Sequence, residues 1–387
     1  MRKITEIAII GSGIIGMTCA LVLSNIKNIK VTLYGKTTYP SPYKTTAILK
    51  TSFDIYQKLG LLNETNDEIT KLTEFIIMDQ TSGNNRLLNF KSKELNLDCF
   101  AYNIRDIDLC RILNDKIQEK ENIQLNKEFV THIQNDINEI LVKTKNTEES
   151  YKLIVGADGK NSISRKFAKI HAKKILHNEL ILITSIKHTG HHNNISYEFH
   201  RKGNLVTSVP LSKKESAIII IDNKKNIKNY TDLVILKEYL SGVFNKYLGL
   251  IETVNDIKIL ESEKLTVNKL SNNRTILVGE SAHAFPPLGA QGLNLGLRDI
   301  LSLHKIINSD TEDPGRKVQI NKYHLSRWDD IYSKSKSVDL LYKSMMENKK
   351  IYQLIRKVGY FGLNKSQRIR RYLLSQGMAI NSDTLDI

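Results

Sequence analysis

The sequence has few cysteines and no long apolar run, and each absence excludes a class of protein. Cys19, Cys99 and Cys110 are odd in number and far apart, so they form neither a disulfide framework nor a metal-binding spacing. A reducing compartment is therefore expected, which favours a cytoplasmic location. No stretch of 18 or more apolar residues is present, so no transmembrane helix is expected. The apolar N-terminal stretch up to Leu23 resembles a signal peptide, but Glu6 and three glycines interrupt it.

Internal repeats and dense basic blocks with interleaved aromatic residues are also missing, so nucleic-acid binding is not expected. The formal charge is nevertheless +16. This excess has two interpretations: attraction to an anionic surface such as a membrane, or compositional drift in a chain rich in Lys, Ile and Asn. The hydrophobic content of 41% is ordinary for a globular protein, and the length of 387 residues suits one large domain or two interleaved ones.

The N-terminal residues have the pattern of a dinucleotide-binding turn. An apolar, β-branched run at 4–10 precedes GSGIIG at 11–16, and a helical segment and a second strand follow. In this context Gly11 permits a tight turn, Gly13 lets a pyrophosphate approach the backbone, and Gly16 lets helix and strand pack closely. The alternative is a glycine-rich turn that packs a helix on a strand and holds no ligand.

The acidic residue that should end the second strand and hold an adenosine ribose is missing. Tyr34-Gly35-Lys36 stands in its place, and Gly35 offers no side chain. The ribose is then held by other groups, or the dinucleotide binds less tightly. Lys36 is a candidate phosphate contact, with a solvated surface lysine as the alternative.

A second glycine-rich turn is expected in the middle of the chain. Residues 151–159 indicate a buried parallel strand that ends in an acidic turn, with Asp158 near the start of a helix at 162–167. Taken alone, this pattern also fits a plain strand-to-helix turn. Elsewhere in the first half, a helix is expected over 44–62, and a hairpin of 75–80 and 86–90 is expected around Ser82-Gly83-Asn84.

Short β-rich segments between residues 179 and 265 predict an antiparallel sheet, inserted between two α/β stretches as a lid or substrate wall. His188, His191 and His192 fall in a polar loop there. Solvated loop residues are expected at these positions in preference to a metal site, and no metal is expected elsewhere.

Residues 274–299, RTILVGESAHAFPPLGAQGLNLGLRD, predict a strand, a loop and a helix. Pro286-Pro287 excludes helix in the loop, and the segment becomes helical by 294–303. A glycine-bearing helix start presents free N–H groups and the positive end of the helix dipole, which suits an anion or a polar, electron-rich ring.

The last part of the chain is expected to be helical. After a loop at 305–314, a long helix is predicted over 317–345, then a helical hairpin over 351–375 that breaks at 359–362. Near its end a basic cluster adjoins apolar residues, namely Arg368, Arg370, Arg371, Tyr372, Leu373 and Leu374. Such an end fits either an anionic membrane surface or a docking helix with a solvated basic face.

GSGIIG, VGADG and VGESAHAFPPLGAQGLNLGLRD stand in an order that resembles the class A flavoprotein monooxygenases of the para-hydroxybenzoate hydroxylase fold. The late segment is most similar to the ubiquinone-biosynthesis hydroxylases, although Ala290 replaces the first glycine of their Gly-Gln-Gly-x-Asn-x-Gly core. The resemblance implies an α/β fold with a Rossmann-like FAD-binding domain, an interleaved antiparallel-sheet substrate domain and C-terminal helices. The FAD-binding domain would take residues 1–75, 100–175 and 266–330, the substrate domain 76–99 and 176–265, and the C-terminal helical segment 331–387.

The resemblance also implies roles for individual residues. Gly11, Gly13 and Gly16 would cradle the FAD pyrophosphate. Asp158 and Gly159 belong to a motif linked to both FAD and the reduced nicotinamide cofactor. The other cofactor contacts expected are Lys36, Lys44, Arg105, Gly279 and Glu280.

Glu280 would hold the ribityl chain, where most relatives use Asp. Lys44 and Arg105 match positions near the flavin. His283 is expected to organise its loop, and no residue is assigned as an acid or base. The loop expected to line the flavin ring comprises Pro287, Gly289, Gln291, Gly292 and Asn294.

The function implied is hydroxylation of the aromatic ring of a polyprenyl phenol in ubiquinone biosynthesis. NADPH or NADH would reduce FAD, and O2 would then give a flavin hydroperoxide that transfers oxygen to the ring. We also expect a peripheral position on the inner face of the membrane and membership of a ubiquinone-biosynthesis complex. The alternatives are a hydroxylase of another aromatic, a prenyl-chain reductase, and a non-catalytic scaffold subunit, the last favoured by Gly35.

Overall fold

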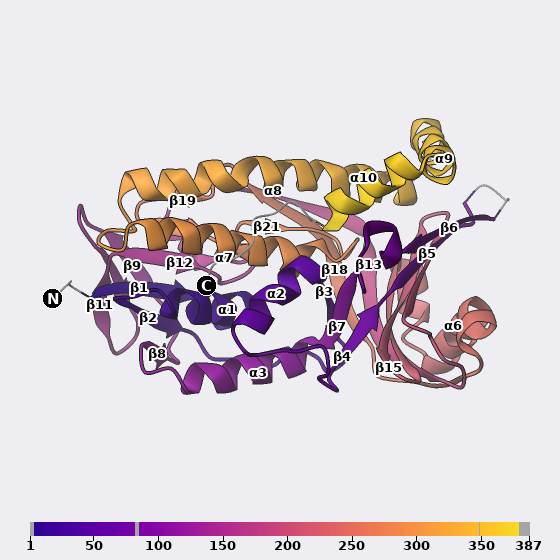
Figure 1. Cartoon of the computed structure of the whole chain (residues 1–387), viewed down its shortest axis with the longest axis horizontal. Coiled ribbons are helices and arrows are strands. Elements are labelled where there is room, and N and C mark those ends of the chain that lie inside the picture. Colours follow the sequence, from indigo (N-terminus) through magenta and orange to yellow (C-terminus); the bar gives the residue numbers. More distant parts are fainter. Residues whose placement is uncertain (1–3, 82–84, 348, 379–387) are drawn as a thin grey trace.

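A computed structural model describes residues 4–81, 85–347 and 349–378. Two sheets lie at opposite ends of an elongated molecule, and helices run along them (Figure 1). This arrangement confirms the expected α/β class with C-terminal helices. The turn expected at Ser82-Gly83-Asn84 and the end of the predicted C-terminal segment, 379–387, lie outside the described residues.

The first sheet is mostly parallel and has the order β19-β20-β12-β1-β2-β8. Its strands are near-continuous apolar runs because both faces are covered. Helices α1, α3 and α7 pack on one face, and a small antiparallel sheet of β9, β10 and β11 packs on the other. The bounds are β1 (Thr5–Ile10), α1 (Ile14–Ser24), β2 (Ile29–Tyr34), α3 (Asp106–Gln118), β8 (Ile123–Asn126), β9 (His132–Asn135), β10 (Ile140–Lys143), β11 (Glu148–Tyr151), β12 (Leu153–Gly156), α4 (Ile163–Phe167), β19 (Ser271–Asn272), β20 (Thr275–Leu277) and α7 (Gln291–Ser309).

The second sheet is mainly antiparallel, with the order β21-β18-β13-β16-β15-β14-β5-β6 and β17 paired to β13, which confirms the sheet and the hairpin predicted from the sequence. Helices α5 and α6 cover its outer face. The bounds are β5 (Glu74–Asp79), β6 (Arg86–Lys91), η1 (Ser92–Leu95), β13 (Ala172–His188), β14 (Ile195–Arg201), β15 (Asn204–Ser212), β16 (Glu215–Asn223), α5 (Lys224–Asn229), α6 (Leu233–Leu248), β17 (Ile251–Val254), β18 (Lys258–Val267), η2 (Gly279–Ser281) and β21 (His283–Ala284).

The helix predicted over 44–62 is wrong in its first part. Residues Thr45–Leu49 form strand β3, and helix α2 covers only Lys50–Lys58. Strand β3 pairs with β7 (Ala101–Arg105), which also pairs with β4 (Ile69–Leu72). The β-branched residues Thr45, Thr46 and Ile48 suit a strand, and the pairing with a strand distant in sequence outweighs the local helical spacing.

The C-terminal helices are α8 (Lys317–Met346), α9 (Lys350–Lys365) and α10 (Gln367–Met378). Helix α8 spans the molecule, because Tyr323 packs in the core of the parallel sheet and Val338 packs on the antiparallel sheet. The break predicted at 359–362 is wrong, since α9 continues through it and ends before Ser366. The loop predicted at 305–314 is also partly wrong, because α7 extends to Ser309. No helix in the described ranges combines the length and apolarity needed to cross a bilayer.

The histidines of the predicted polar loop are mostly not solvated. His188 ends strand β13 fully buried, with Nδ1 3.0 Å from the Gly190 carbonyl oxygen and Nε2 3.0 Å from the Ser216 hydroxyl. His192 is buried as well, and its Nε2 lies 2.6 Å from the Ser212 carbonyl oxygen. Burial lowers the pKa of both rings. These contacts make His188 and His192 structural groups, and within the described residues no cluster of metal-ligand side chains occurs.

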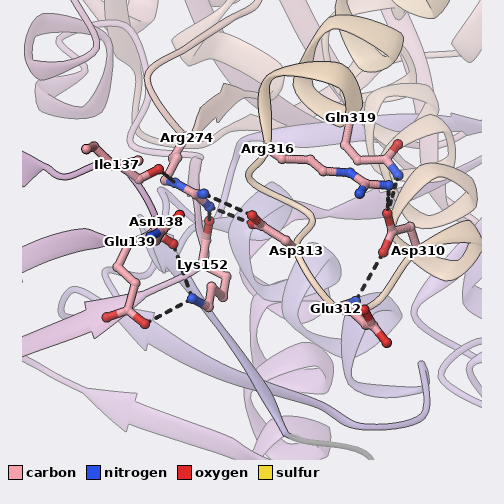
Figure 2. A network of polar contacts seen from close by, with 10 residues as sticks. All are labelled: Ile137, Asn138, Glu139, Lys152, Arg274, Asp310, Glu312, Asp313, Arg316 and Gln319. Carbon is pink, nitrogen blue, oxygen red and sulfur yellow. Dashed lines mark hydrogen bonds and ion pairs between the residues drawn. The ribbon is translucent and has the colours of Figure 1, made fainter.

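A polar network ties the amino-terminal edge of the parallel sheet to the loop before α8 (Figure 2). Buried Arg274 makes two hydrogen bonds to the Asp313 carboxylate, at 2.6 and 2.9 Å, and donates to the carbonyl oxygens of Lys152 at 3.0 Å and Ile137 at 3.2 Å. The close approach also requires Gly315, because a Cβ there would lie 1.8 Å from the Lys152 oxygen.

We expect Arg274→Met to reduce the free energy of unfolding by about 2 kcal/mol, because it leaves two buried carbonyls and a carboxylate without their donor. Urea-induced unfolding measures the loss. The matched control is Arg316→Gln in the same network, because Arg316 is half exposed in its pair with Asp310 and should lose less than about 1 kcal/mol. Equal losses of unfolding free energy in both variants would contradict the stabilising role assigned to Arg274.

Candidate cofactor site

Four turns meet at the carboxyl-terminal edge of the parallel sheet. Strands β1, β2, β12 and β20 are parallel neighbours, so the turns that follow them lie side by side. Gly11 N donates to the Tyr34 carbonyl oxygen at 2.9 Å, and Ala157 N donates to the Ile10 carbonyl oxygen at 2.8 Å. Ligands of open α/β sheets bind outside this edge, so the turns define the candidate site.

The three glycines of the turn between β1 and α1 have different roles. Gly11 has φ +111°, and a Cβ on it would lie 2.4 Å from the Ala157 oxygen. A Cβ on Gly16 would lie 1.7 Å from the Gly11 oxygen, so both residues need glycine for close packing. A Cβ on Gly13 would meet nothing within 4 Å. Gly13 therefore lines open space, as a backbone that receives a ligand should.

The start of α1 is also electrostatically suited to a diphosphate. Gly13 is the N-cap, no side chain caps the helix, and its first turn contains no acidic residue. The positive end of the helix dipole and the first N–H groups thus face open space without a neutralising carboxylate. The residues present fit the pyrophosphate of a dinucleotide.

Gly35 follows β2 directly and has φ +117°, a conformation that L side chains rarely adopt. A Cβ there would also lie 3.3 Å from the Ser12 hydroxyl. The backbone geometry therefore accounts for glycine where an acidic residue was expected. Lys36, the next residue, is exposed.

The turn after β12 is organised by Asp158. Its carboxylate accepts hydrogen bonds from the Ser162 hydroxyl at 2.6 Å and from Ser164 N at 2.9 Å, close to the start of α4. Arg165 then donates to the carbonyl oxygen of Ser281 at 2.8 Å, which ties this turn to the late segment. Gly159 has φ +74° and faces open space. The contacts of Asp158 are those of a strand-to-helix turn. Of the two motif residues, Asp158 and Gly159, it is Gly159 that a ligand can approach.

The segment after β20 is held from behind by a buried ionic network. The Asp299 carboxylate accepts from Gly279 N at 3.0 Å, lies 2.7 Å from His283 Nε2, and accepts from Arg327 Nε at 2.8 Å. His283 and Asp299 are fully buried. This position agrees with the loop-organising role expected of His283, while Glu280 is exposed.

The predicted flavin-ring loop divides into exposed and buried members. Pro287, Gly289 and Gly292 are exposed, and a Cβ on Gly292 would meet nothing within 4 Å. Helix α7 begins at Gln291 with no side-chain cap and no acidic residue in its first turn. Gln291 Nε2 donates to the Gly289 carbonyl oxygen at 2.9 Å, while its buried Oε1 has no hydrogen-bond partner among the described residues. An uncapped helix start with an unsatisfied acceptor suits a polar ring.

Asn294 is not brought to this open surface. Its side chain is buried, accepts from Leu49 N at 2.9 Å, and donates to the carbonyl oxygens of Ala47 at 2.9 Å and Ala290 at 2.6 Å. The amide thus fastens the first turn of α7 to strand β3. Asn294 positions the loop from behind rather than lining it.

Lys44 and Arg105 are anchored by carboxylates that the sequence analysis missed. Lys44 Nζ lies 3.0 Å from Asp106, whose charge raises the pKa of Lys44, with a smaller contribution from Glu280. Arg105 pairs with Glu215 of the antiparallel sheet at 2.8 Å. Asp106 could have been found from the sequence, because it directly follows a predicted strand next to Arg105. Nothing near Glu215 in the sequence indicates that it pairs with Arg105.

The family model described as FAD binding domain matches residues 4–329. The ubiquinone hydroxylase UbiM of Neisseria meningitidis is 24% identical over 82% of this chain and 72% of its own length. The 3-demethoxyubiquinol 3-hydroxylase of Escherichia coli is 20% identical over 97% of this chain and 99% of its own length.

Solved structures agree on the fold. The p-nitrophenol 4-monooxygenase PnpA of Pseudomonas putida superposes with a TM-score of 0.78 at 17% identity and covers both chains completely. The FAD-dependent monooxygenase PqsL of Pseudomonas aeruginosa has a TM-score of 0.75 at 16% identity, over 92% of this chain and 99% of that one. The chain therefore belongs to the FAD binding domain family, as a flavoprotein of the class A monooxygenases.

Proposed function

We propose that the protein hydroxylates the aromatic ring of a polyprenyl phenol in ubiquinone biosynthesis, with FAD as cofactor, NADPH or NADH as reductant and O2 as co-substrate. The observation that supports this most directly is the similarity over nearly the whole chain to a relative named as a 3-demethoxyubiquinol 3-hydroxylase. Bound FAD would supply electron transfer and oxygen activation.

The chain's own residues have three tasks in such a reaction. Gly13 would receive the diphosphate at the start of α1, in a turn whose close packing Gly11 and Gly16 allow. Glu280 would meet the ribityl chain. The start of α7 at Gln291 and Gly292 would direct N–H groups at the ring system and stabilise negative charge that develops there.

The inner face of the antiparallel sheet suits an apolar substrate. Next to Leu288 of the flavin-ring loop, an apolar cluster joins sheet residues to the end of α8. Methionines are adaptable in packing, and each buried methylene of a prenyl tail contributes about 0.8 kcal/mol. The cluster comprises Ile181, Ile183, Leu205, Ile221, Leu288, Val338, Tyr342, Met345 and Met346.

A visible spectrum of gently purified protein, before and after FAD addition, tests the cofactor, and phenol-dependent NAD(P)H oxidation coupled to product formation tests the reaction. Product from a prenylated phenol would support the proposal. Turnover of soluble aromatics alone, or a protein that cannot be reconstituted with FAD, would contradict it. The second result would favour the scaffold alternative.

We further propose that α9 and α10 lie on an anionic membrane surface, which would place the protein at the inner face of the membrane. Ile351, Leu354, Val358 and Phe361 form one helical stripe of α9 and are 56–63% exposed. Between residues 349 and 378 the sequence has eight Lys or Arg and no Asp or Glu. Arg370 pairs with Glu94, and an exposed apolar stripe beside the remaining basic residues complements anionic lipid headgroups. Membership of a ubiquinone-biosynthesis complex is compatible with this position.

We expect the protein to float with vesicles of phosphatidylcholine and phosphatidylglycerol but not with phosphatidylcholine alone, and to be released by high salt. Phe361→Glu should weaken binding at least about tenfold, because one large apolar side chain contributes about 1.5–3 kcal/mol when buried. Ile137→Glu is the control, since Ile137 is 86% exposed but lies in the segment between β9 and β10. Equal binding by both variants would refute the assignment.

A further inference from the structure

Polar side chains interrupt the inner face of the antiparallel sheet, the face opposite to α6. His200 of β14 lies opposite Asp79 of β5 and Leu205 of β15, and Glu198 lies opposite Thr207 of β15. Alternate residues of a strand share a face, so Glu198 and His200 point to the same side. Leu205 belongs to the apolar cluster that contains Leu288, so these groups begin one strand, about 4.8 Å, from that cluster.

These side chains are buried, and some of them are hydrogen-bonded to one another. His200 Nε2 lies 2.5 Å from Glu198 Oε1, and the Thr207 hydroxyl donates to Glu198 Oε2 at 3.4 Å. Asp79 Oδ1 accepts from Thr81 N at 3.0 Å. Asp79 is fully buried, and His200 and Glu198 are 4% and 7% exposed.

Helix α9 covers this polar group with polar side chains of its own. Buried Tyr360 packs with Leu88 and Phe90 of β6. Ile77, which lies two residues before Asp79 on the same face of β5, packs in the same cluster as Tyr360. Burial, and then the nearby charges of Asp79 and Glu198, raise the pKa of Tyr360. Arg356 lies one turn earlier on the same side of α9. The helix thus turns Arg356 and Tyr360 inward while its apolar stripe faces out.

Four buried atoms in this group have no hydrogen-bond partner within the described part of the chain. They are Asp79 Oδ2, His200 Nδ1, Tyr360 Oη and Arg356 Nη1, although Arg86 Nη1 lies 3.9 Å from Asp79 Oδ2 in a long ion pair. His200 Nε2 faces a carboxylate, so Nδ1 is the ring nitrogen that is left without a partner. Asp79 contributes an acceptor, Arg356 a donor, and Tyr360 a hydroxyl that can do either, and buried polar groups without partners are rare in native proteins.

We propose that Asp79, His200, Arg356 and Tyr360 form a binding site for the oxygenated ring of a neutral phenolic substrate, between the inner sheet face and α9. A ring with a hydroxyl and a second oxygen satisfies acceptors and donors together, whereas the two carboxylates disfavour an anion. The inference rests on the proposed function, because it assigns part of that substrate to these residues.

The test is calorimetric titration of the FAD-loaded protein, without NAD(P)H, with a 2-methoxyphenol that carries a short alkyl chain. Tyr360→Phe removes only an unpaired hydroxyl, so we expect an unchanged melting temperature but binding that is about 5–10-fold weaker. The alkylbenzene without oxygens should bind the variant and the parent equally. Asp79→Asn, which keeps the shape of the side chain, should weaken binding of the methoxyphenol in the same selective way.

Tyr197→Phe is the matched control, because Tyr197 lies on the same strand as His200 but packs on the outer face. Unchanged methoxyphenol affinity in Tyr360→Phe would overturn the site and leave ordered water as its occupant. Equal loss for the methoxyphenol and the alkylbenzene would overturn it as well. If the variants lose affinity only for the methoxyphenol, but the protein does not hydroxylate any phenol, the binding site would be supported and the proposed reaction would be contradicted.

Discussion

Gly13→Asp is expected to give a folded but colourless protein. The new carboxylate would occupy the open space at the start of α1, where the diphosphate of FAD is expected, and would repel its negative charges. Aspartate is a favourable N-cap, so the helix itself should be stabilised by some tenths to about 1 kcal/mol. We therefore expect FAD affinity to fall at least about 100-fold, measured by flavin absorbance after titration, with no loss in melting temperature.

Two neighbouring substitutions separate charge from packing. Gly13→Ala adds a methyl group in open space, so the fold should be retained and FAD affinity should fall less than with aspartate. Gly16→Ala forces a methyl group to within 1.7 Å of the Gly11 oxygen and should destabilise the apoprotein itself. Full flavin content in Gly13→Asp would show that the diphosphate does not bind at this turn.

Asp299→Asn should cost about 3–5 kcal/mol of unfolding free energy, the largest stability effect that we expect. The carboxylate faces three donors, from Gly279, His283 and Arg327, and an amide would turn its own donor toward one of them. The charge of Arg327, which is 5% exposed, would lose a main partner and keep only Asp330. Urea-induced unfolding of the FAD-free protein measures the loss.

Asp108→Asn is the control for a carboxylate in an exposed pair, with Arg111, and should change stability by less than about 1 kcal/mol. Adding Arg327→Met to Asp299→Asn should restore part of the loss, because the guanidinium that lost Asp299 is then no longer buried. A loss below about 1 kcal/mol for Asp299→Asn would contradict the assigned network.

The pH dependence of this loss has a defined sign. Burial alone raises the pKa of Asp299, but the charges of His283 and Arg327 outweigh it, so the pKa lies below its ordinary value. A carboxylate with a lowered pKa stabilises the protein above its unfolded pKa of about 3.9, and this contribution is lost as the pH falls through the folded pKa. The difference between parent and variant should therefore shrink in acid.

Local patterns predicted the elements whose neighbours in sequence are also their neighbours in space. GSGIIG between an apolar strand and a helix predicted the β1 to α1 turn, because the glycine spacing and both flanking elements lie within one short segment. The antiparallel sheet followed from strand-length apolar segments, and long helices such as α8 followed from their periodicity. The domain boundaries inferred from the resemblance stay predictions.

Long-range pairing decided what local patterns left ambiguous. Residues 45–49 have a helical spacing of apolar side chains, yet they form β3 because pairing with β7 and the hydrogen bonds of Asn294 satisfy their backbone. His188 and His192 look like loop residues in a polar sequence, but the antiparallel sheet buries them. A helix continues through Gly359 and Gly362 because neither glycine adopts the positive φ that ends a helix, so both keep the helical backbone.

The FAD-binding family, the order of the three glycine-rich segments and the class of fold could all be predicted from the amino-acid sequence, because they depend on spacing within short segments. Which side chains face the cofactor and which support it from behind depends on packing between distant segments. Asn294, Asp158 and His283 lie in cofactor motifs, yet their polar atoms are directed to backbone and buried charges. The polar group under α9 joins residues from β5, β14 and α9 that are more than 100 positions apart, and only packing brings such residues together.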